Sequence, residues 1–185
     1  MKVINYLNNN ADPNYHLLAS NHETGIKKKL IENYSVKSEK EYYQKVVTVI
    51  SRQLPFILEN LNGNLNGKVI LDLGCGAKNC RDNDYGNYEP WLCRTLHLLE
   101  VKVIGVDVDD SLSKESFVNH VVDLFSSNSL AMIESNSVDL VHASSLFDSV
   151  AVVEKSGFSA IDKFKQTLMP EIKRVLKKDG VFLYC

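Results

Sequence analysis

The residues best suited to chemistry lie in one short run, residues 69–76, with the sequence VILDLGCG. Its apolar residues bracket one carboxylate, Asp72, as in a parallel strand that is covered on both faces. Gly74 and Gly76 follow directly, and glycine lets the backbone turn sharply and approach a ligand without a Cβ in the way. Because ligands of open α/β sheets bind beyond the carboxyl ends of the strands, this run predicts both a fold and a binding site.

Two further predicted strands also carry an acid at their ends, since residues 101–107 end at Asp107 and residues 119–124 include Asp123. A carboxylate at the tip of the strand after a glycine turn can accept both hydroxyls of a ribose. Asp123 is placed to accept a hydrogen bond from the exocyclic amine of an adenine. One such acid would suit a cap or a turn, whereas three on consecutive strands predict a nucleoside-like site.

The elements that must position these acids alternate along the chain. We predict strands at 68–73, 101–107, 119–124, 138–143 and 181–185, with helices or loops between them. This alternation is typical of a parallel sheet with right-handed crossovers. Before the first strand, Ser38 and Glu41 form a capping box for a helix whose apolar face runs from Tyr43 to Leu61, and Pro55 should kink or divide it. Residues 1–36 show no strong periodicity, with turn signals at residues 12–13 and 24–25.

Composition places the chain among ordinary globular domains, with 185 residues, 44% apolar residues and a net charge of −2. The balance gives no strong nucleic-acid signal, and the one basic cluster, Lys27-Lys28-Lys29, suits a solvated face. We expect no membrane span and no secretory leader. The four cysteines form no metal-binding spacing, so we predict no metal site and expect a reducing, cytoplasmic setting.

Four motifs occur in order, and together they resemble the class I S-adenosylmethionine-dependent methyltransferases. They are VILDLGCG at 69–76, VIGVD at 103–107, SVDLV at 137–141 and EIKRVLKKDG at 171–180. The resemblance covers residues 68–185 and implies a doubly wound, mostly parallel Rossmann-like sheet in three αβα layers. We therefore divide the single structural unit into a helical N-terminal extension, 1–66, and an S-adenosylmethionine-binding domain, 67–185.

The resemblance also implies roles for the matching positions. Asp72, Gly74, Cys75 and Gly76 would face the methionine portion of S-adenosylmethionine, and Asp107 would hold its ribose. Val108, next to Asp107, is also expected to contact the cofactor. Asp123 and Leu124 would border the adenine. The cofactor carries an ammonium, a carboxylate and a sulfonium, so an acid-rich pocket suits its net positive charge.

Two departures from the family pattern bear on this interpretation. Lys78 stands where the family has a third glycine, and Asn79 stands where a dinucleotide-binding loop would have one. The missing glycine at position 79 argues more strongly against dinucleotide binding than the one at position 78 argues against the methyltransferase pattern. In a dinucleotide-binding loop, that glycine lets the helix pack close to the strand beneath a pyrophosphate. A polar stretch, 77–89, lengthens the first crossover and is either a lid or substrate loop or a tolerated insertion.

Candidate catalytic residues follow the fourth predicted strand. His142 and Asp148 lie where the family often has substrate contacts, although a hydrogen-bonded structural histidine and a helix cap are the plainer interpretations. Cys75 has no activating neighbour in sequence and suits a small residue in a tight turn.

The family usually continues with two more strands, which this chain lacks after residue 185. The apolar edge at 181–185 should then be covered by a homodimer partner or by the N-terminal segment, and a truncated chain is an equally plain explanation.

The expected activity is methyl transfer from S-adenosylmethionine to an acceptor that these motifs do not identify. The alternative is a catalytically silent, methyltransferase-like module that binds a protein partner. A nicotinamide-dependent oxidoreductase ranks below both.

Overall fold

The structure is a computed structural model that describes residues 1–34, 38–76, 89–144, 146 and 159–185. Six strands form one sheet in the order β1-β6-β5-β2-β3-β4, and all of its neighbouring strands are parallel. The strands are β1 (Lys2–Asn5), β2 (Val69–Leu73), β3 (Lys102–Asp107), β4 (Val118–Val121), β5 (Val138–Ala143) and β6 (Leu176–Tyr184). The predicted α/β class is therefore confirmed.

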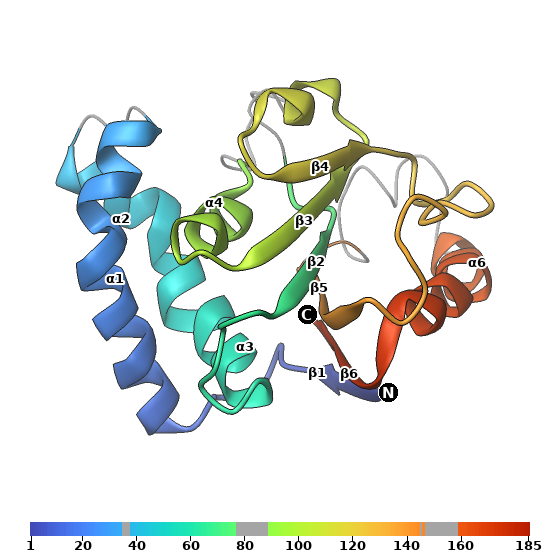
Figure 1. Cartoon of the computed structure of the whole chain (residues 1–185), viewed down its shortest axis with the longest axis horizontal. Coiled ribbons are helices and arrows are strands. Elements are labelled where there is room, and N and C mark those ends of the chain that lie inside the picture. Colours follow the sequence, from blue (N-terminus) through green and yellow to red (C-terminus); the bar gives the residue numbers. More distant parts are fainter. Residues whose placement is uncertain (35–37, 77–88, 145, 147–158) are drawn as a thin grey trace.

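Helices cover both faces of this sheet (Figure 1). One face packs against α1 (Pro13–Asn33), α2 (Glu39–Thr48), α3 (Leu54–Asn60) and α4 (Trp91–Leu98), and the other packs against α6 (Ser159–Val175). Both faces need cover because successive side chains of β2 point to opposite faces of the sheet. Ile70 packs in the apolar cluster on the face of α1 to α4, whereas Leu71 and Leu73 pack in the cluster on the face of α6. The three-layer arrangement thus follows from a strand that is apolar on both sides.

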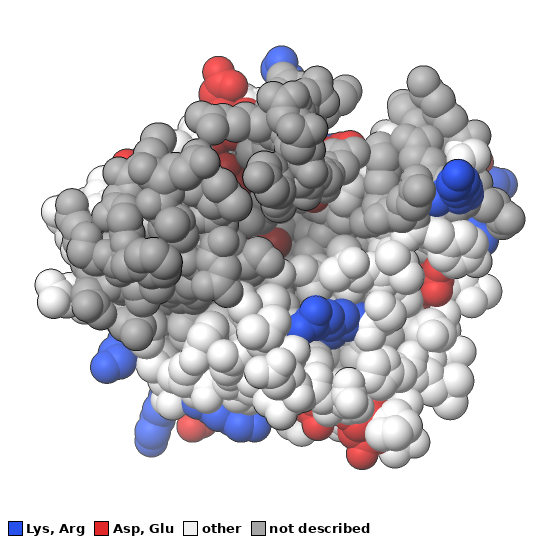
Figure 2. Space-filling view, turned by 180° about the vertical axis from the view of Figure 1, so that it is seen from behind, with Lys and Arg blue, Asp and Glu red and all other residues white. Residues whose placement is uncertain are grey.

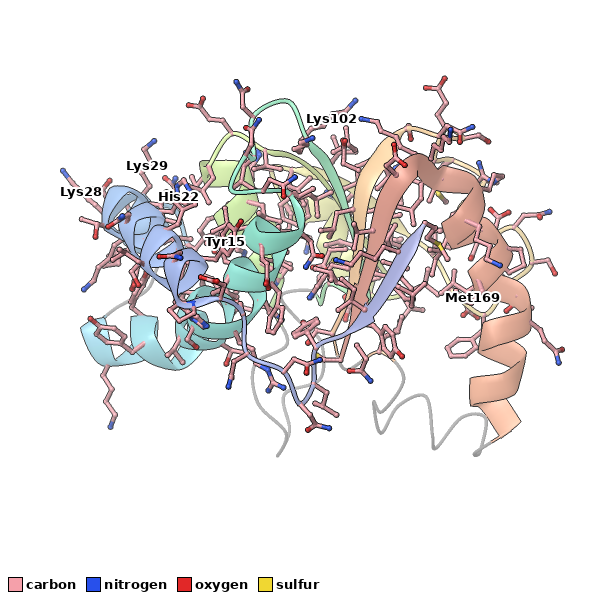
Figure 3. All side chains as sticks on the ribbon, turned by 90° about the horizontal axis from the view of Figure 1, so that it is seen from below. Tyr15, His22, Lys28, Lys29, Lys102 and Met169 are labelled. Atoms are coloured by element: carbon pink, nitrogen blue, oxygen red, sulfur yellow. The ribbon has the colours of Figure 1, made fainter. Side chains whose placement is uncertain are left out.

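The N-terminal extension is not helical throughout, because residues 2–5 form the edge strand of the sheet. β1 runs beside β6, from the pair Lys2–Val181 to the pair Asn5–Tyr184, and the two lie side by side in Figure 3. The edge of β6 is therefore covered by the chain's own N-terminal segment, one of the two covers expected from the sequence. A homodimer through residues 181–185 would have to displace β1.

Helix α1 corrects the predicted turn at residues 24–25. Asp12 caps its start by accepting a hydrogen bond from the backbone N–H of Asn14 at 2.8 Å, and Pro13 occupies the first turn. Gly25 lies inside the helix, where a Cβ would have open space on all sides. A glycine within a helix costs about 1 kcal/mol relative to alanine, which the helix tolerates because Ala19, Ile26 and Leu30 are buried.

The helix predicted from residue 38 onward is divided, as expected, just before Pro55. A π-helical segment, η1 (Val49–Gln53), joins α2 to α3. Such a segment adds one residue to a turn and so shifts the phase of the apolar stripe. As a result α2 buries Tyr42 and Val46, whereas Tyr43 and Val47, which the uninterrupted pattern placed on the apolar face, are about half exposed.

Strand boundaries differ from the predictions by more than one residue at two places. β4 ends at Val121 rather than 124, and β6 begins at Leu176 rather than 181. Asp139, within the SVDLV motif, helps to explain the second difference. Its carboxylate accepts hydrogen bonds from the Val69 N–H at 2.9 Å and from Lys177 Nζ at 2.8 Å. It thereby ties the beginnings of β2, β5 and β6 together, which is a structural role.

Candidate functional site

The order of the strands contains one point at which the direction of winding reverses. From β2 the chain proceeds outward through β3 to β4 on one side, and β5 and β6 lie on the other. The carboxyl ends of these strands share one edge, opposite the end of β3 that is marked by Lys102 in Figure 3. Ligands of doubly wound sheets bind in the crevice outside such a switch point. Asp72 and His142, which are register partners on β2 and β5, flank it.

The glycine turn after β2 folds over the end of β3. Gly74 has φ of +66° and Gly76 has φ of +85°, a region that other residues rarely adopt. The N–H groups of Gly74 and Cys75 donate to the carbonyl of Val106 at 2.8 and 3.1 Å. Leu146, which follows β5, lies so close that a Cβ on Gly74 would stand 2.8 Å from its Cδ1. Gly74 is therefore required by its φ, whereas a Cβ there would only have to displace the end of the flexible Leu146 side chain.

Asp107, at the end of β3, is joined to this turn by a hydrogen bond. One carboxylate oxygen accepts the N–H of Gly76 at 2.9 Å, and the other accepts those of Val108 at 2.7 Å and Asp109 at 3.2 Å. The residue is only 9% exposed, while Val108 beside it is 62% exposed. Three backbone donors thus hold an acceptor-only side chain in one orientation at the carboxyl edge of the sheet.

Asp123 and Leu124 reach the same edge, two and three residues beyond the end of β4. The segment is tied to β3 because the N–H of Val122 donates to the carbonyl of Asp107 at 2.8 Å. Asp123 is exposed, and its carboxylate accepts the N–H of Phe125 at 2.9 Å in a turn, whereas Leu124 is buried. Their contact with an adenine stays a prediction.

Asp72 points into the interior rather than along the rim. It is 4% exposed, and its Oδ1 lies 2.7 Å from His142 Nδ1, while its Oδ2 accepts a hydrogen bond from Cys93 Sγ at 3.5 Å. His142 is also buried, and its Nε2 lies 2.7 Å from the hydroxyl of Tyr6. A continuous hydrogen-bonded chain, Tyr6–His142–Asp72, therefore links the N-terminal strand to the first motif.

The partners of His142 determine its proton positions. Burial raises the pKa of Tyr6 well above its usual value, so its hydroxyl keeps its proton. In a neutral imidazole whose Nδ1 faces the acceptor-only carboxylate of Asp72, Nε2 is the nitrogen that accepts from this hydroxyl. Nδ1 then carries the proton and donates to the carboxylate of Asp72. Both ring nitrogens of His142 are thus hydrogen-bonded in the interior, where the residue holds Asp72 in place. These contacts favour a structural histidine over a catalytic one.

The environment of the two cysteines beside this chain of hydrogen bonds raises the pKa of both thiols, which disfavours a nucleophilic role. A hydrogen bond with Cys93 lowers the pKa of Cys75, but burial and the carboxylates of Asp72 and Asp107 outweigh it and raise the pKa. Burial raises that of Cys93. Both sulfurs pack on Gly105, where an added Cβ would lie 3.0 and 3.3 Å from them. Cys75 is therefore a small residue in a tight turn, as predicted.

Tyr6 is the part of this network that sequence reasoning missed. Replacing Tyr6 by phenylalanine should lower the free energy of unfolding by about 1–2 kcal/mol, because Nε2 of His142 then loses its buried partner. The ring contact with Phe56, at 4.9 Å between centroids, should survive. Tyr43→Phe is the matched control, since Tyr43 is 50% exposed, and it should change stability by less than about 0.5 kcal/mol. Equal effects in urea denaturation would contradict the network.

The remaining predictions concern Asp148, the polar stretch after the glycine turn, metal ligands, membrane-spanning helices and surface charge. Asp148 and residues 77–88 lie outside the described residues. In the described ranges no group of three or more His, Cys, Asp and Glu side chains could hold a metal ion. No helix among the described residues is long and apolar enough to cross a bilayer. On the face in Figure 2, the described acidic and basic side chains are interspersed with uncharged ones rather than gathered by sign.

No protein-family model matches this chain, and no curated protein matches it in sequence. Among solved structures, it is similar to a Methanococcus maripaludis protein described as a candidate S-adenosyl-L-methionine-dependent methyltransferase, with 17% identity and a TM-score of 0.44. That alignment covers 78% of this chain and 60% of the other. It is also similar to the trans-methyltransferase CalH in complex with SAH, with 12% identity and a TM-score of 0.41, over 96% of this chain and 49% of that one. The chain thus spans about half to three fifths of these structures.

Proposed function

We propose that the chain binds S-adenosylmethionine and transfers its methyl group to an acceptor. The observation that carries the proposal is the pairing of the Gly74–Gly76 turn with the carboxylate of Asp107, at the carboxyl edge of the sheet beside its switch point. In this proposal the rigidly held carboxylate of Asp107 accepts hydrogen bonds from the ribose. The backbone beside it turns sharply at two glycines, which have no side chain to block a ligand.

The hydrogen bonds of the turn favour this cofactor over a dinucleotide. A pyrophosphate-binding turn directs its free N–H groups at the phosphates. Here the N–H groups of Gly74 and Cys75 are bonded to Val106, and that of Gly76 is bonded to a carboxylate. An anionic phosphate would have to displace Asp107 and would meet its negative charge. A cofactor with a ribose and a net positive charge needs no such displacement.

The chemistry asked of the protein is modest. S-adenosylmethionine, when bound, supplies an electrophilic methyl group, and holding the acceptor in line with that group accounts for much of the rate. In this proposal Asp107 holds the ribose, the glycine turn adjoins the methionine portion, and Asp123 with Leu124 borders the adenine. Asp72 is fixed behind the turn by His142 and contributes negative charge from the interior.

The proposal is tested by titrating the chain with S-adenosylmethionine and, separately, with NAD in a calorimeter. We expect saturable binding of S-adenosylmethionine and none of NAD at the same concentrations. Binding of NAD alone would reject the proposal in favour of an oxidoreductase. Binding of S-adenosylmethionine without turnover, across a broad screen of acceptors, would instead support the silent, partner-binding module.

A further inference from the structure

A concave site lies next to the end of β1, apart from the glycine turn and Asp107. It is a cavity of about 430 Å³, lined by residues 7–11 and by His16, Ser51, Arg52 and Phe56. Its volume falls in the range of small-molecule sites, which is about 300–1,000 Å³. The lining combines apolar walls, Leu7 and Phe56, with polar groups.

Arg52 gives this cavity its charge. The guanidinium donates one hydrogen bond, from Nη2 to the carbonyl of Leu7 at 2.6 Å. No carboxylate of the described residues pairs with it, and none of the described lining residues is acidic. The nearest acid in sequence to this lining, Asp12, is bonded to the backbone of Asn14 instead. A partly buried guanidinium with unused N–H groups in an acid-free cavity favours an anionic ligand.

The cavity is linked to the proposed cofactor site by a row of contacting side chains. Residues 7–11 follow β1 at the carboxyl edge of the sheet, where the N–H of Tyr6 donates to the carbonyl of Tyr184 at 3.0 Å. Phe56, in the wall of the cavity, packs on the ring of Tyr6. Tyr6 in turn is hydrogen-bonded to His142, which holds Asp72 beside the glycine turn. The two sites therefore share one edge and one set of supports.

We propose that this cavity binds the carboxylate of a small, partly apolar organic acid, with Arg52 as the residue that recognises it. That this acid is the methyl acceptor rests on the proposed function. The binding itself does not depend on it. A lone guanidinium matches the two oxygens of a carboxylate, whereas phosphate sites add a ring of backbone N–H groups or further cations. Leu7 and Phe56 then contact the apolar body of the acid.

The test compares two probes of the same shape, benzoate and benzamide, titrated into the full chain without S-adenosylmethionine and followed by NMR. We expect wild-type protein to prefer benzoate, and Arg52→Gln to weaken benzoate binding about tenfold or more while leaving benzamide binding unchanged. Arg52→Lys keeps a cation and should retain a preference for benzoate. The control is Lys28→Gln, because the Lys28 side chain is 85% exposed and projects from α1 away from the molecule in Figure 3.

An undiminished preference for benzoate in Arg52→Gln would overturn the proposal, as would equal binding of the two probes by wild-type protein. Tighter binding of inorganic phosphate than of benzoate would also overturn it, since the ligand class would then be wrong. Because the titration contains no cofactor, a failure of S-adenosylmethionine to bind rejects the proposed function and leaves this result standing.

Discussion

Replacing Arg94 by glutamine is expected to lower the free energy of unfolding by about 3–5 kcal/mol, the usual cost of removing one partner from a buried ion pair. The Arg94 side chain is 3% exposed and lies between two acids. Nε and Nη2 donate to Glu115 at 3.1 and 2.6 Å, and Nη1 donates to Glu89. The variant leaves both carboxylates partly or wholly buried without their cation.

Two further observations make this the largest stability effect that we expect. Burial by itself would lower the pKa of Arg94, but the hydrogen bonds with Glu115 and Glu89 outweigh it and raise the pKa, so the cation persists at all working pH values. The guanidinium also lies 4.5 Å from the ring centroid of Trp91 and 4.6 Å from that of Tyr34. Its loss therefore weakens the packing of α1 against α4 as well.

Thermal and urea unfolding measure the effect directly, and a loss of this size corresponds to a fall in Tm on the order of 10 °C. The control is Lys28→Gln, which breaks the exposed pair with Glu32 and should cost less than about 0.5 kcal/mol. If the two variants unfolded alike, the buried ion pair would not have the stabilising role assigned to it.

Replacing Asp107 by alanine is expected to weaken binding of S-adenosylmethionine by about 1–3 kcal/mol, or roughly 5- to 150-fold. The variant removes the acceptor proposed for the ribose. It also frees the N–H groups of Gly76, Val108 and Asp109, whose hydrogen bonds fix the turn. Asp107→Asn keeps one acceptor oxygen and should fall between wild type and alanine.

The matched control for this variant is Asp110→Ala, which removes the same charge from an exposed position in the neighbouring 3-10 helix. Calorimetry on both variants, with circular dichroism to verify folding, separates a specific contact from a loss of negative charge. Unchanged affinity in a folded Asp107→Ala protein would contradict the ribose assignment, and an equal loss in both variants would reduce it to charge alone.

The central strand, its glycine turn and the placement of Asp107 beside that turn could all be predicted from the sequence. Each depends on short-range information: an apolar run covered on both faces, two glycines at positions with positive φ, and an acid at the end of the next strand. The buried stripe of α6 was also predictable, because Leu168, Ile172 and Val175 recur at helical spacing.

The phase of a helix was decided only by tertiary structure. The π-helical segment before Pro55 moves the buried face of α2 by one residue, so Tyr42 rather than Tyr43 enters the core. A regular 3.6-residue pattern assumes an unbroken helix. The extra residue in the turn is accommodated by packing against α1 and α4, which a one-dimensional pattern does not contain.

The sequence by itself therefore determined the sheet class and the rim that carries Asp107, since strand and turn preferences act between near neighbours. Only the tertiary structure joined Tyr6 to His142, which is 136 residues away, paired residues 2–5 with β6, and placed Arg52 over the loop that follows β1. A four-residue strand and a lone buried polar group have almost no local signature. Their partners depend on burial, because a polar atom that is removed from water needs a hydrogen-bond partner, and the tertiary fold decides which groups lie within reach.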